Sequence, residues 1–361
     1  MNEYQKRIKS LVGLLPEDID AAILTSEVNI FYFSGFRCDA ATLVIDRQGG
    51  AFITDFRYVE AARDAVSVCE TTMSTGGEYD TLKGICESHG IKTFAVERSG
   101  MTVAALAAMA RALDPAAPDN TSRLDDIISS LRISKSDTEV VCVKAAQAIT
   151  EDGFDHIISC IKEGVTEKEL ALELEFFMRG HGAERVSFDP IVASGENGSK
   201  PHAVPGERKI KLGDLITFDL GCVVGGYCSD MTRTVAFGHA DDEARAVYDI
   251  VLAAQLAALE YLLAGGDDAA ECDGKARALI SGAGYGECFG HSLGHGVGLN
   301  VHESPSMSPR VKATLSPGTI VTVEPGIYIP GKMGVRIEDM VLKTEDSIVN
   351  LTHMTKELIM V

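Results

Sequence analysis

Residues 216–234 read ITFDLGCVVGGYCSDMTRT, and this stretch decides how the rest of the chain is interpreted. Apolar and polar residues alternate at its start, which is typical of a β-strand. Gly225-Gly226 in its middle predicts a tight two-residue turn, because glycine adopts a positive φ at little cost. The stretch therefore predicts a β-hairpin whose two arms pair across this turn.

Two aspartates lie in the predicted hairpin. The turn would place Asp219 opposite Thr232 and Asp230 opposite Gly221, so that the two carboxylates are diagonal neighbours on one face. Like charges placed in this way repel each other, and a hard divalent cation would relieve the repulsion because it takes carboxylate oxygens as ligands. Alone, two such aspartates more often belong to a solvated polar face, so residues further along must decide.

The composition is that of a soluble globular protein large enough for two domains: 361 residues, 45% hydrophobic and 24% charged. The net charge of −20 argues against nucleic acid or an anionic membrane as a partner, since both need a basic face. We expect no membrane span and no signal peptide. Nine scattered cysteines without a C-x-x-C pair favour reduced thiols and a cytoplasmic location.

Two domains are expected, at residues 1–128 and 129–361. The first has the pattern of a small α/β domain, without the residue types of a catalytic cluster. Pro115 and Pro118, followed by the polar residues 119–122, would end its last helix and begin the connection to the second domain. Its expected strands are residues 21–24, 41–45, 51–54 and 93–96, and its expected helices are residues 57–66 and 101–113.

The second domain is expected to repeat the order helix, helix, strands, which suggests two similar halves. A capping box at Thr166 and Glu169 begins one helix, which would end at Gly180 or Gly182. The buried face expected for this helix consists of Leu170, Leu174 and Phe177. The other expected helices are residues 134–153, 242–263 and 269–280.

Histidine and glycine concentrate at two places in this domain. Residues 289–302 read FGHSLGHGVGLNVH, and residues 194–202 read SGENGSKPH. His291 and His295 have the spacing of a helical ligand pair, but the interior glycines oppose a helix and favour a loop that lets the backbone approach a ligand. A lone histidine is usually structural. This density near carboxylate strands instead favours a functional site.

Two glutamates end apolar strands near the C-terminus. Glu324 closes TIVTVE, and Glu338 lies in GVRIEDM, which is expected to form one strand over residues 334–340. A buried carboxylate is costly unless it is paired or bound to metal. Asp339 would point to the opposite face of its strand, so only one of the two adjacent acids can join the cluster.

Two aspartates, one histidine and two glutamates suit hard divalent ions better than a structural zinc, which prefers cysteine and histidine. Two metals about 3.5–4 Å apart can hold a bridging hydroxide and polarise a carbonyl. This ligand inventory therefore indicates hydrolytic chemistry.

Together, these motifs resemble the pita-bread metallopeptidases, which include aminopeptidase P, prolidase, methionine aminopeptidase and the metal-free creatinases. The resemblance covers residues 130–361 through FDLGCVVGGYCSDMTRT, GHGVGLNVHE, VEPGIY and GVRIEDM. NIFYFSGF and TDFRY near the start resemble the creatinase-type N-terminal domain. The resemblance implies an α/β (α+β) chain with a pita-bread catalytic domain. Because methionine aminopeptidases lack the creatinase-type N-terminal domain, it also points to the proline-specific branch.

The resemblance also implies roles for particular residues. The metal ligands would be Asp219, Asp230, His295, Glu324 and Glu338. Asp230 and Glu338 would bridge two ions, and Glu324 would also relay a proton from water to the leaving amine. His302 would hydrogen-bond the scissile carbonyl or its oxyanion. The residues expected around the substrate are His202, His291, His302 and Arg336. Because all five ligands are present, the resemblance favours the metal-dependent members over the metal-free creatinases.

The implied reaction is hydrolysis of the bond between an N-terminal residue and proline, whose amide has no N–H and a fixed φ. We expect an Xaa-Pro aminopeptidase with two Mn²⁺ ions, with Co²⁺, Zn²⁺ or Fe²⁺ as alternative metals, acting as a homodimer. The close alternative is a prolidase restricted to dipeptides. Some similar prolidases carry an arginine soon after the HE motif, and residues 302–307 here contain none. A third alternative is a non-catalytic binding module.

Overall fold

The computed structural model describes residues 1–77 and 79–361, which divide into two compact units, Met1–Arg132 and Ile133–Val361. Unit 1 contains a six-stranded mixed sheet in the order β4-β3-β2-β1-β5-β6. Its strands are β1 (Ala21–Leu24), β2 (Ala41–Asp46), β3 (Ala51–Thr54), β4 (Glu70–Met73), β5 (Thr93–Val96) and β6 (Ala117–Pro118). Its helices are α1 (Glu3–Leu14), α2 (Glu27–Ser34), α3 (Val59–Ala65), α4 (Asp80–His89), α5 (Val103–Ala112) and α6 (Arg123–Ile133).

The four strands and two helices expected in unit 1 are confirmed, with helix ends shifted by one to two residues. The hairpin of β2 and β3 pairs Val44 with Ala51 beside the Gly49-Gly50 turn. Helix α6 was not expected, because the polar residues before it were interpreted as a connection. Ser122 is followed by an acidic first helical turn at Asp125 and Asp126, which favours a helix N-terminus.

Unit 2 has the expected order of a helix pair and strands, twice over. Its first half contains α7 (Asp137–Cys160), α8 (Glu167–Gly180), β7 (Arg185–Val186), β8 (Ile191–Ser194), η1 (Gly195–Ser199), β9 (Leu215–Leu220), β10 (Cys222–Val224), β11 (Tyr227–Cys228) and β12 (Met231–Ala236). Its second half contains α9 (Asp242–Leu263), α10 (Ala269–Gly282), η2 (Gly286–Cys288), β13 (Gly294–Gly296), β14 (Glu303–Met307), β15 (Ile320–Val323), β16 (Gly326–Ile329), β17 (Met333–Arg336), β18 (Asp339–Lys343) and β19 (Ile348–Asn350).

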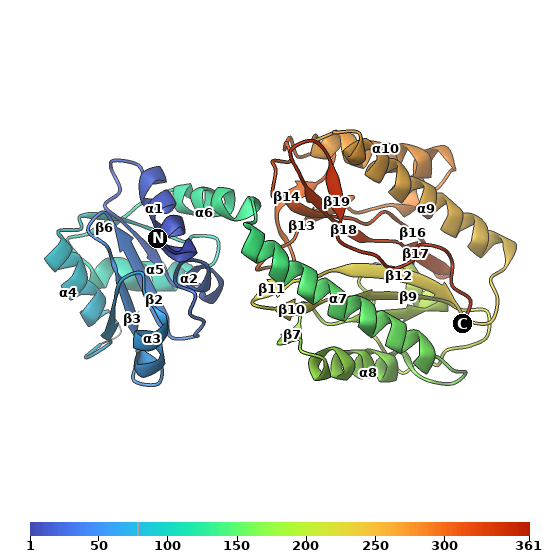
Figure 1. Ribbon diagram of the computed structural model, residues 1–361, viewed down its shortest axis with the longest axis horizontal. Coiled ribbons are helices and arrows are strands. Elements are labelled where there is room, and N and C mark those ends of the chain that lie inside the picture. The colour runs from blue at the N-terminus through green and yellow to red at the C-terminus, as the bar shows by residue number, and fades with distance from the viewer. Residues whose placement is uncertain (78) are drawn as a thin grey trace. The chain divides into compact units, whose positions relative to one another are not determined.

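The sheets of unit 2 lie between the two helix pairs, with α7 and α8 on one side and α9 and α10 on the other (Figure 1). One apolar core joins α7 and α8 to β9 and β12 through residues such as Phe154 and Phe218. A second core joins α9 and α10 to β15 and β17 through residues such as Val251 and Val335. The polar site described below lies among the strands that these two cores support.

The organising hairpin has the predicted register. Asp219 pairs with Thr232 between β9 and β12, and the same register continues to Val224 and Tyr227 beside the turn. The turn glycines, residues 225 and 226, have φ of 58° and 83°, which is the positive-φ geometry of a two-residue hairpin turn. The register therefore places both aspartates where the sequence predicts them.

Two predictions about helices need correction. The helix expected from 134 begins after the cap Ser136 and continues to Cys160. In α8 the capping box is confirmed, but Met178 is buried and Phe177 is half-buried. Phe177 instead stacks between the rings of His156 and His181, with centroids 4.3 and 3.9 Å away.

Helix α9 bears on the expectation of no membrane span. Its 22 residues meet the criteria of length and composition. Many of its residues pack in the core of unit 2, so we interpret α9 as a core helix: Ala244, Val247, Tyr248, Val251, Ala254, Gln255, Ala258, Leu259 and Leu262 are buried.

The strand expected over residues 334–340 is interrupted. β17 ends at Arg336 and pairs with β16, whereas β18 begins at Asp339 and pairs with β15. The chain changes partner strands at residues 337–338, and Glu338 lies in this break. This interruption separates the backbone of Glu338 from both ladders.

Candidate metal centre

Five acidic and histidine side chains from five separate segments line one cavity of about 510 Å³. Asp219 lies on β9, and Asp230 immediately precedes β12. His295 is the central residue of β13, and Glu324 and Glu338 follow the ends of β15 and β17. The structure therefore brings together all five residues that the sequence predicts as metal ligands.

Distances within the cluster are those of groups that share one small volume. His295 Nε2 lies 3.2 Å from Glu324 Oε1 and 3.6 Å from Asp230 Oδ2. One ligand atom from each of Asp230, His295 and Glu338 lies within 4.8 Å of the others. Within the described residues, Asp219 Oδ1 and Glu338 Oε1 are buried and accept no hydrogen bond. These unpaired oxygens, in an oxygen-rich donor set, fit divalent cations.

Burial and mutual repulsion control the protonation of these carboxyls. Burial, together with the charge of Glu324, raises the pKa of Asp219 and lifts that of Glu338 well above its ordinary value. The pKa of Asp230 is also well above its ordinary value, through burial and then the charge of Glu338. Without a cation, the fold favours protons on these groups.

Glu324 and His295 form an ion pair inside this cluster. Burial alone would raise the pKa of Glu324, but the hydrogen bond and charge of His295 lower it. Burial alone would lower the pKa of His295, but the hydrogen bond and charge of Glu324 raise it. A cation that binds here competes with the proton of His295 as well as with the protons of the carboxyls.

Buried side chains behind the cluster hold two of its carboxylates by hydrogen bonds. Arg336 Nη2 donates to Asp219 Oδ2 at 2.6 Å, its Nη1 donates to Tyr328 Oη at 2.8 Å, and its Nε donates to Thr232 Oγ1 at 3.1 Å. Thr232 Oγ1 in turn donates to Glu338 Oε2 at 2.6 Å. Arg336 therefore contacts the predicted ligand Asp219 directly.

Three further histidines predicted for the substrate site, His202, His291 and His302, also line the cavity. The ring of His302 lies 4.1 Å from that of His295, and His291 Nε2 lies 2.9 Å from Tyr328 Oη. Burial is the main cause that lowers the pKa of both His291 and His302. At neutral pH these two imidazoles are therefore neutral, and each carries one N–H donor.

Comparisons with known proteins assign this architecture. Residues 141–345 match metallopeptidase family M24, and residues 7–134 match the creatinase/prolidase N-terminal domain. The chain belongs to metallopeptidase family M24. An uncharacterized peptidase of Bacillus subtilis is 42% identical over 98% of this chain and 99% of its own length.

Solved structures agree with the M24 assignment. The Xaa-Pro dipeptidase from Bacillus anthracis is 40% identical, with a TM-score of 0.95 over 99% of this chain and 100% of its own. The X-Pro aminopeptidase from Thermotoga maritima is 36% identical, with a TM-score of 0.90 over 98% of this chain and 100% of its own. The fold is thus a pita-bread domain preceded by a creatinase-like domain, and the M24 protein is a metal-dependent exopeptidase.

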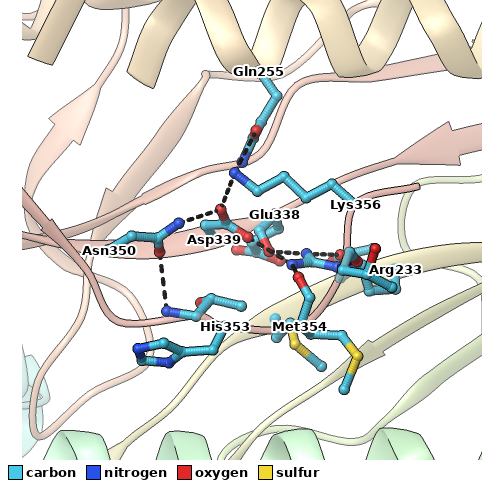
Figure 2. Close-up of polar contacts among 12 residues, drawn as sticks. Arg233, Gln255, Glu338, Asp339, Asn350, His353, Met354 and Lys356 are labelled. Carbon is cyan, nitrogen blue, oxygen red and sulfur yellow. Dashed lines mark hydrogen bonds and ion pairs between the residues drawn. The ribbon is translucent and has the colours of Figure 1, made fainter. Parts of the chain in front are cut away.

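Asp339 follows Glu338 but lies outside the M24 cavity, as the strand alternation predicts. Its carboxylate accepts from Arg233 Nη2 and Asn350 Nδ2, both at 2.8 Å, and pairs with Lys356 Nζ at 2.7 Å (Figure 2). Burial alone would raise the pKa of Asp339, but the charges of Arg233 and Lys356 lower it. Asp339 is therefore ionised and pairs with Arg233 and Lys356 outside the cavity. Glu338 is the one of the two acids that lines the cavity.

The sequence interpretation assigned no role to Thr232, Tyr328 or Arg233. Each was present in a quoted motif, Thr232 and Arg233 in DMTRT and Tyr328 in VEPGIY. Their types gave no direct signal, because threonine, tyrosine and arginine are not typical metal ligands: Thr232 and Arg233 contact Glu338, and Tyr328 contacts His291 and Arg336. Their proximity to predicted ligands was the available clue.

The raised carboxyl pKa values predict how pH affects the metal-free M24 protein. A carboxyl whose pKa is higher in the folded state stabilises the fold below its unfolded pKa, and this contribution is lost as pH rises through the folded pKa. The loss for Asp230 begins near its ordinary value of 3.8 and continues upward. Since asparagine does not titrate, the free energy of unfolding of chelated Asp230→Asn should increase relative to that of chelated wild type as pH rises.

Denaturant unfolding of both proteins from pH 4 to pH 8, in the presence of chelator, measures this difference. Both proteins contain Asp339, whose pKa is lowered and whose effect on the pH dependence of stability has the opposite sign. Subtracting one curve of unfolding free energy against pH from the other removes the contribution of such shared groups. If the difference between their free energies of unfolding stays constant over this range, the folded state does not raise the pKa of Asp230, and the prediction is wrong.

Proposed function

We propose that the protein is an Xaa-Pro aminopeptidase that hydrolyses the bond between an N-terminal residue and proline in short peptides. The observation that carries the proposal is the convergence of Asp219, Asp230, His295, Glu324 and Glu338 on one cavity. Two divalent ions held by these residues would supply an activated water and a Lewis acid for the scissile carbonyl. The remaining chemistry comes from side chains of the chain itself.

Glu324 is proposed as the residue that accepts and returns a proton. Its carboxylate is ionised because His295 lowers its pKa, so it can take the proton of the attacking water and pass it to the leaving amine. His302, neutral and beside His295, would donate its N–H to the carbonyl oxygen as charge develops there. Arg336 would keep Asp219 in place through their 2.6 Å contact.

The remaining cavity lining fits a substrate that contains proline. His202 and His291 lie on the same lining as a group of apolar side chains, which would cover the pyrrolidine ring of the substrate. These apolar residues are Phe188, Ile191, Pro201, Ala203, Val204 and Pro205. A tertiary amide presents no N–H to be satisfied, so an apolar wall is compatible with it.

The charge of the cavity favours an aminopeptidase over a dipeptidase. An enzyme restricted to dipeptides needs a cation for the substrate's free carboxylate. Among the described residues that line the cavity, Arg336 is the only lysine or arginine, and its guanidinium already binds Asp219, Tyr328 and Thr232. The similarity to the Bacillus anthracis Xaa-Pro dipeptidase is the reason to keep the dipeptidase as a second candidate.

Matched substrates separate these two activities. We expect Ala-Pro-Ala to be hydrolysed with a kcat/KM at least equal to that of Ala-Pro, because the one lysine or arginine among the described lining residues, Arg336, already binds Asp219. Release of alanine, measured with both peptides on the same metal-loaded preparation, provides the test, and Ala-Ala-Ala serves as the control for proline specificity. Activity on Ala-Pro alone would establish the dipeptidase. Inactivity on every proline peptide would favour a binding module.

The identity of the metals, the assembly state and the location are part of the same proposal. Oxygen-rich ligands favour two Mn²⁺ ions, with Co²⁺, Zn²⁺ or Fe²⁺ as alternatives. We also propose a homodimer, from the resemblance to dimeric relatives, and a cytoplasmic location, from the nine scattered cysteines without a C-x-x-C pair. The net charge of −20 supports short peptides rather than nucleic acid or a membrane as partners.

A further inference from the structure

Arg233 is among the largest fully buried side chains of the protein, and its guanidinium binds four backbone carbonyls. Nη1 donates to the carbonyl oxygens of Glu338 at 2.6 Å and Thr232 at 2.9 Å. Nε donates to Thr355 O and Nη2 to Met354 O, both at 2.8 Å. One side chain thus connects the strand that follows Asp230, the proposed ligand Glu338 and the C-terminal segment (Figure 2).

The break between β17 and β18 explains why Glu338 needs such a partner. Its carbonyl lies between two ladders and within the protein, where an unpaired acceptor is costly. Arg233 Nη1 satisfies this carbonyl together with that of Thr232. The Glu338 N–H also donates to Thr232 O at 3.1 Å, and Thr232 Oγ1 donates to Glu338 Oε2 at 2.6 Å. Arg233 therefore fixes the backbone of Glu338 and Thr232, and with it the direction in which the Glu338 carboxylate points.

Asp339 makes the burial of this arginine tolerable. It is fully buried and binds Arg233 Nη2, while its other oxygen pairs with Lys356 Nζ. Lys356 Nζ also donates to Gln255 Oε1 at 3.3 Å. The charge of Arg233 is thus balanced behind the cavity, and its remaining donors are free to hold the backbone.

We propose that Arg233 is a positioning residue for the metal centre. It fixes the backbone on both sides of the Thr232–Glu338 hydrogen bond and makes residues 354–356 part of the support of that centre. Arg233 contacts no metal and no substrate, so it acts through Glu338 and Thr232. The inference rests on the proposed function, because it presupposes that Glu338 is a metal ligand.

Arg233→Lys tests the proposal, because lysine keeps the charge but lacks the planar fork that reaches carbonyls on several sides. We expect Mn²⁺ to bind about 10–100-fold more weakly, the usual effect of losing a supporting group. At saturating Mn²⁺ the KM for Ala-Pro-Ala should stay unchanged while kcat falls. Calorimetric titration of the apoprotein with Mn²⁺ measures the affinity independently of activity.

Arg208→Lys is the matched control. Arg208 is also a largely buried arginine of unit 2, and it forms two hydrogen bonds with Asp214, at 2.6 and 2.9 Å. It contacts none of the five proposed ligands, so its replacement should lower the melting temperature without changing the affinity for Mn²⁺. If both variants lose stability and both keep wild-type Mn²⁺ affinity, Arg233 has only a structural role and the proposal is wrong.

Two further outcomes are separable. If wild-type protein binds no Mn²⁺, Co²⁺, Zn²⁺ or Fe²⁺, the proposed function fails and this inference fails with it. If Arg233→Lys does not fold, Asp339→Asn decides, since it keeps the side-chain shape and removes the charge that orients the guanidinium. A folded Asp339→Asn protein with weakened Mn²⁺ binding supports the proposal, and one with wild-type affinity overturns it.

Discussion

Removal of metal is expected to abolish hydrolysis of Xaa-Pro peptides, and Mn²⁺ is expected to restore it. The physical reason is that Asp219 Oδ1 and Glu338 Oε1 are buried without a donor among the described residues, and the raised carboxyl pKa values show that these groups are crowded. The chain supplies no lysine or arginine beyond Arg336 to the described cavity lining, so at neutral pH we expect bound cations to take the place of protons in balancing the remaining charge. Elemental analysis before and after chelation should show two ions lost per chain.

The same experiment has a readout that does not depend on turnover. A cation that binds only the folded protein stabilises it by about 2.7 kcal/mol at a hundred times its Kd. The melting temperature should therefore fall on chelation and recover with Mn²⁺, Co²⁺, Zn²⁺ or Fe²⁺ added singly. Because binding displaces protons, the affinity should also increase with pH. Full activity in chelator, with no metal detectable, would contradict the assignment of a metal centre.

The elements that could be predicted from sequence are those whose pattern is local. The hairpin register follows from one Gly-Gly turn and strand alternation, and it places Asp219 opposite Thr232 as expected. The capping box at Thr166 is equally local, since the cap and Glu169 are three residues apart. The choice of Glu338 over Asp339 followed from the two-residue period of a strand together with the family resemblance.

The features that could not be predicted depend on partners distant in sequence. Apolar alternation over residues 334–340 cannot show that β17 pairs with β16 while β18 pairs with β15. Spacing alone fits either Phe177 or Met178 to the core, and stacking of Phe177 with two histidine rings decides the choice. The role of Arg233 depends on carbonyls more than 100 positions away, so no local pattern indicates it.

The five proposed ligands were predictable by a different route. Composition and strand ends indicated acidic residues that needed a partner, but the complete set came from the family resemblance. The structure adds the geometry, in which His295 lies between Glu324 and Asp230. It also adds Tyr328, which joins His291 to Arg336 through a single hydroxyl. This connection links the proposed substrate site to the support of Asp219.

Asp230→Asn is expected to lower kcat/KM for Ala-Pro-Ala by at least roughly 10³-fold, equivalent to about 4 kcal/mol of transition-state stabilisation. Asp230 lies at the centre of the cluster, 3.6 Å from His295 and within 4.8 Å of a Glu338 ligand atom. An amide of the same shape keeps one oxygen but loses the charge that would hold two cations together. Initial rates over a range of peptide concentrations, at saturating Mn²⁺, measure the loss of kcat/KM, and metal analysis should find fewer than two ions per chain.

Asp230→Asn is informative because it should lose activity while its metal-free form becomes more stable. Loss of activity by misfolding would lower the melting temperature of the metal-free protein, whereas loss of a crowded carboxylate should raise it at neutral pH, because burial and Glu338 already disfavour the charge at position 230. Asp241→Asn is a matched control. Asp241 is the N-cap of α9, so its replacement alters a carboxylate of unit 2 outside the cavity and should leave kcat/KM unchanged. An Asp230→Asn protein that is fully active, or one that is inactive only because its metal-free form is unfolded, would remove the basis for placing Asp230 between two metals.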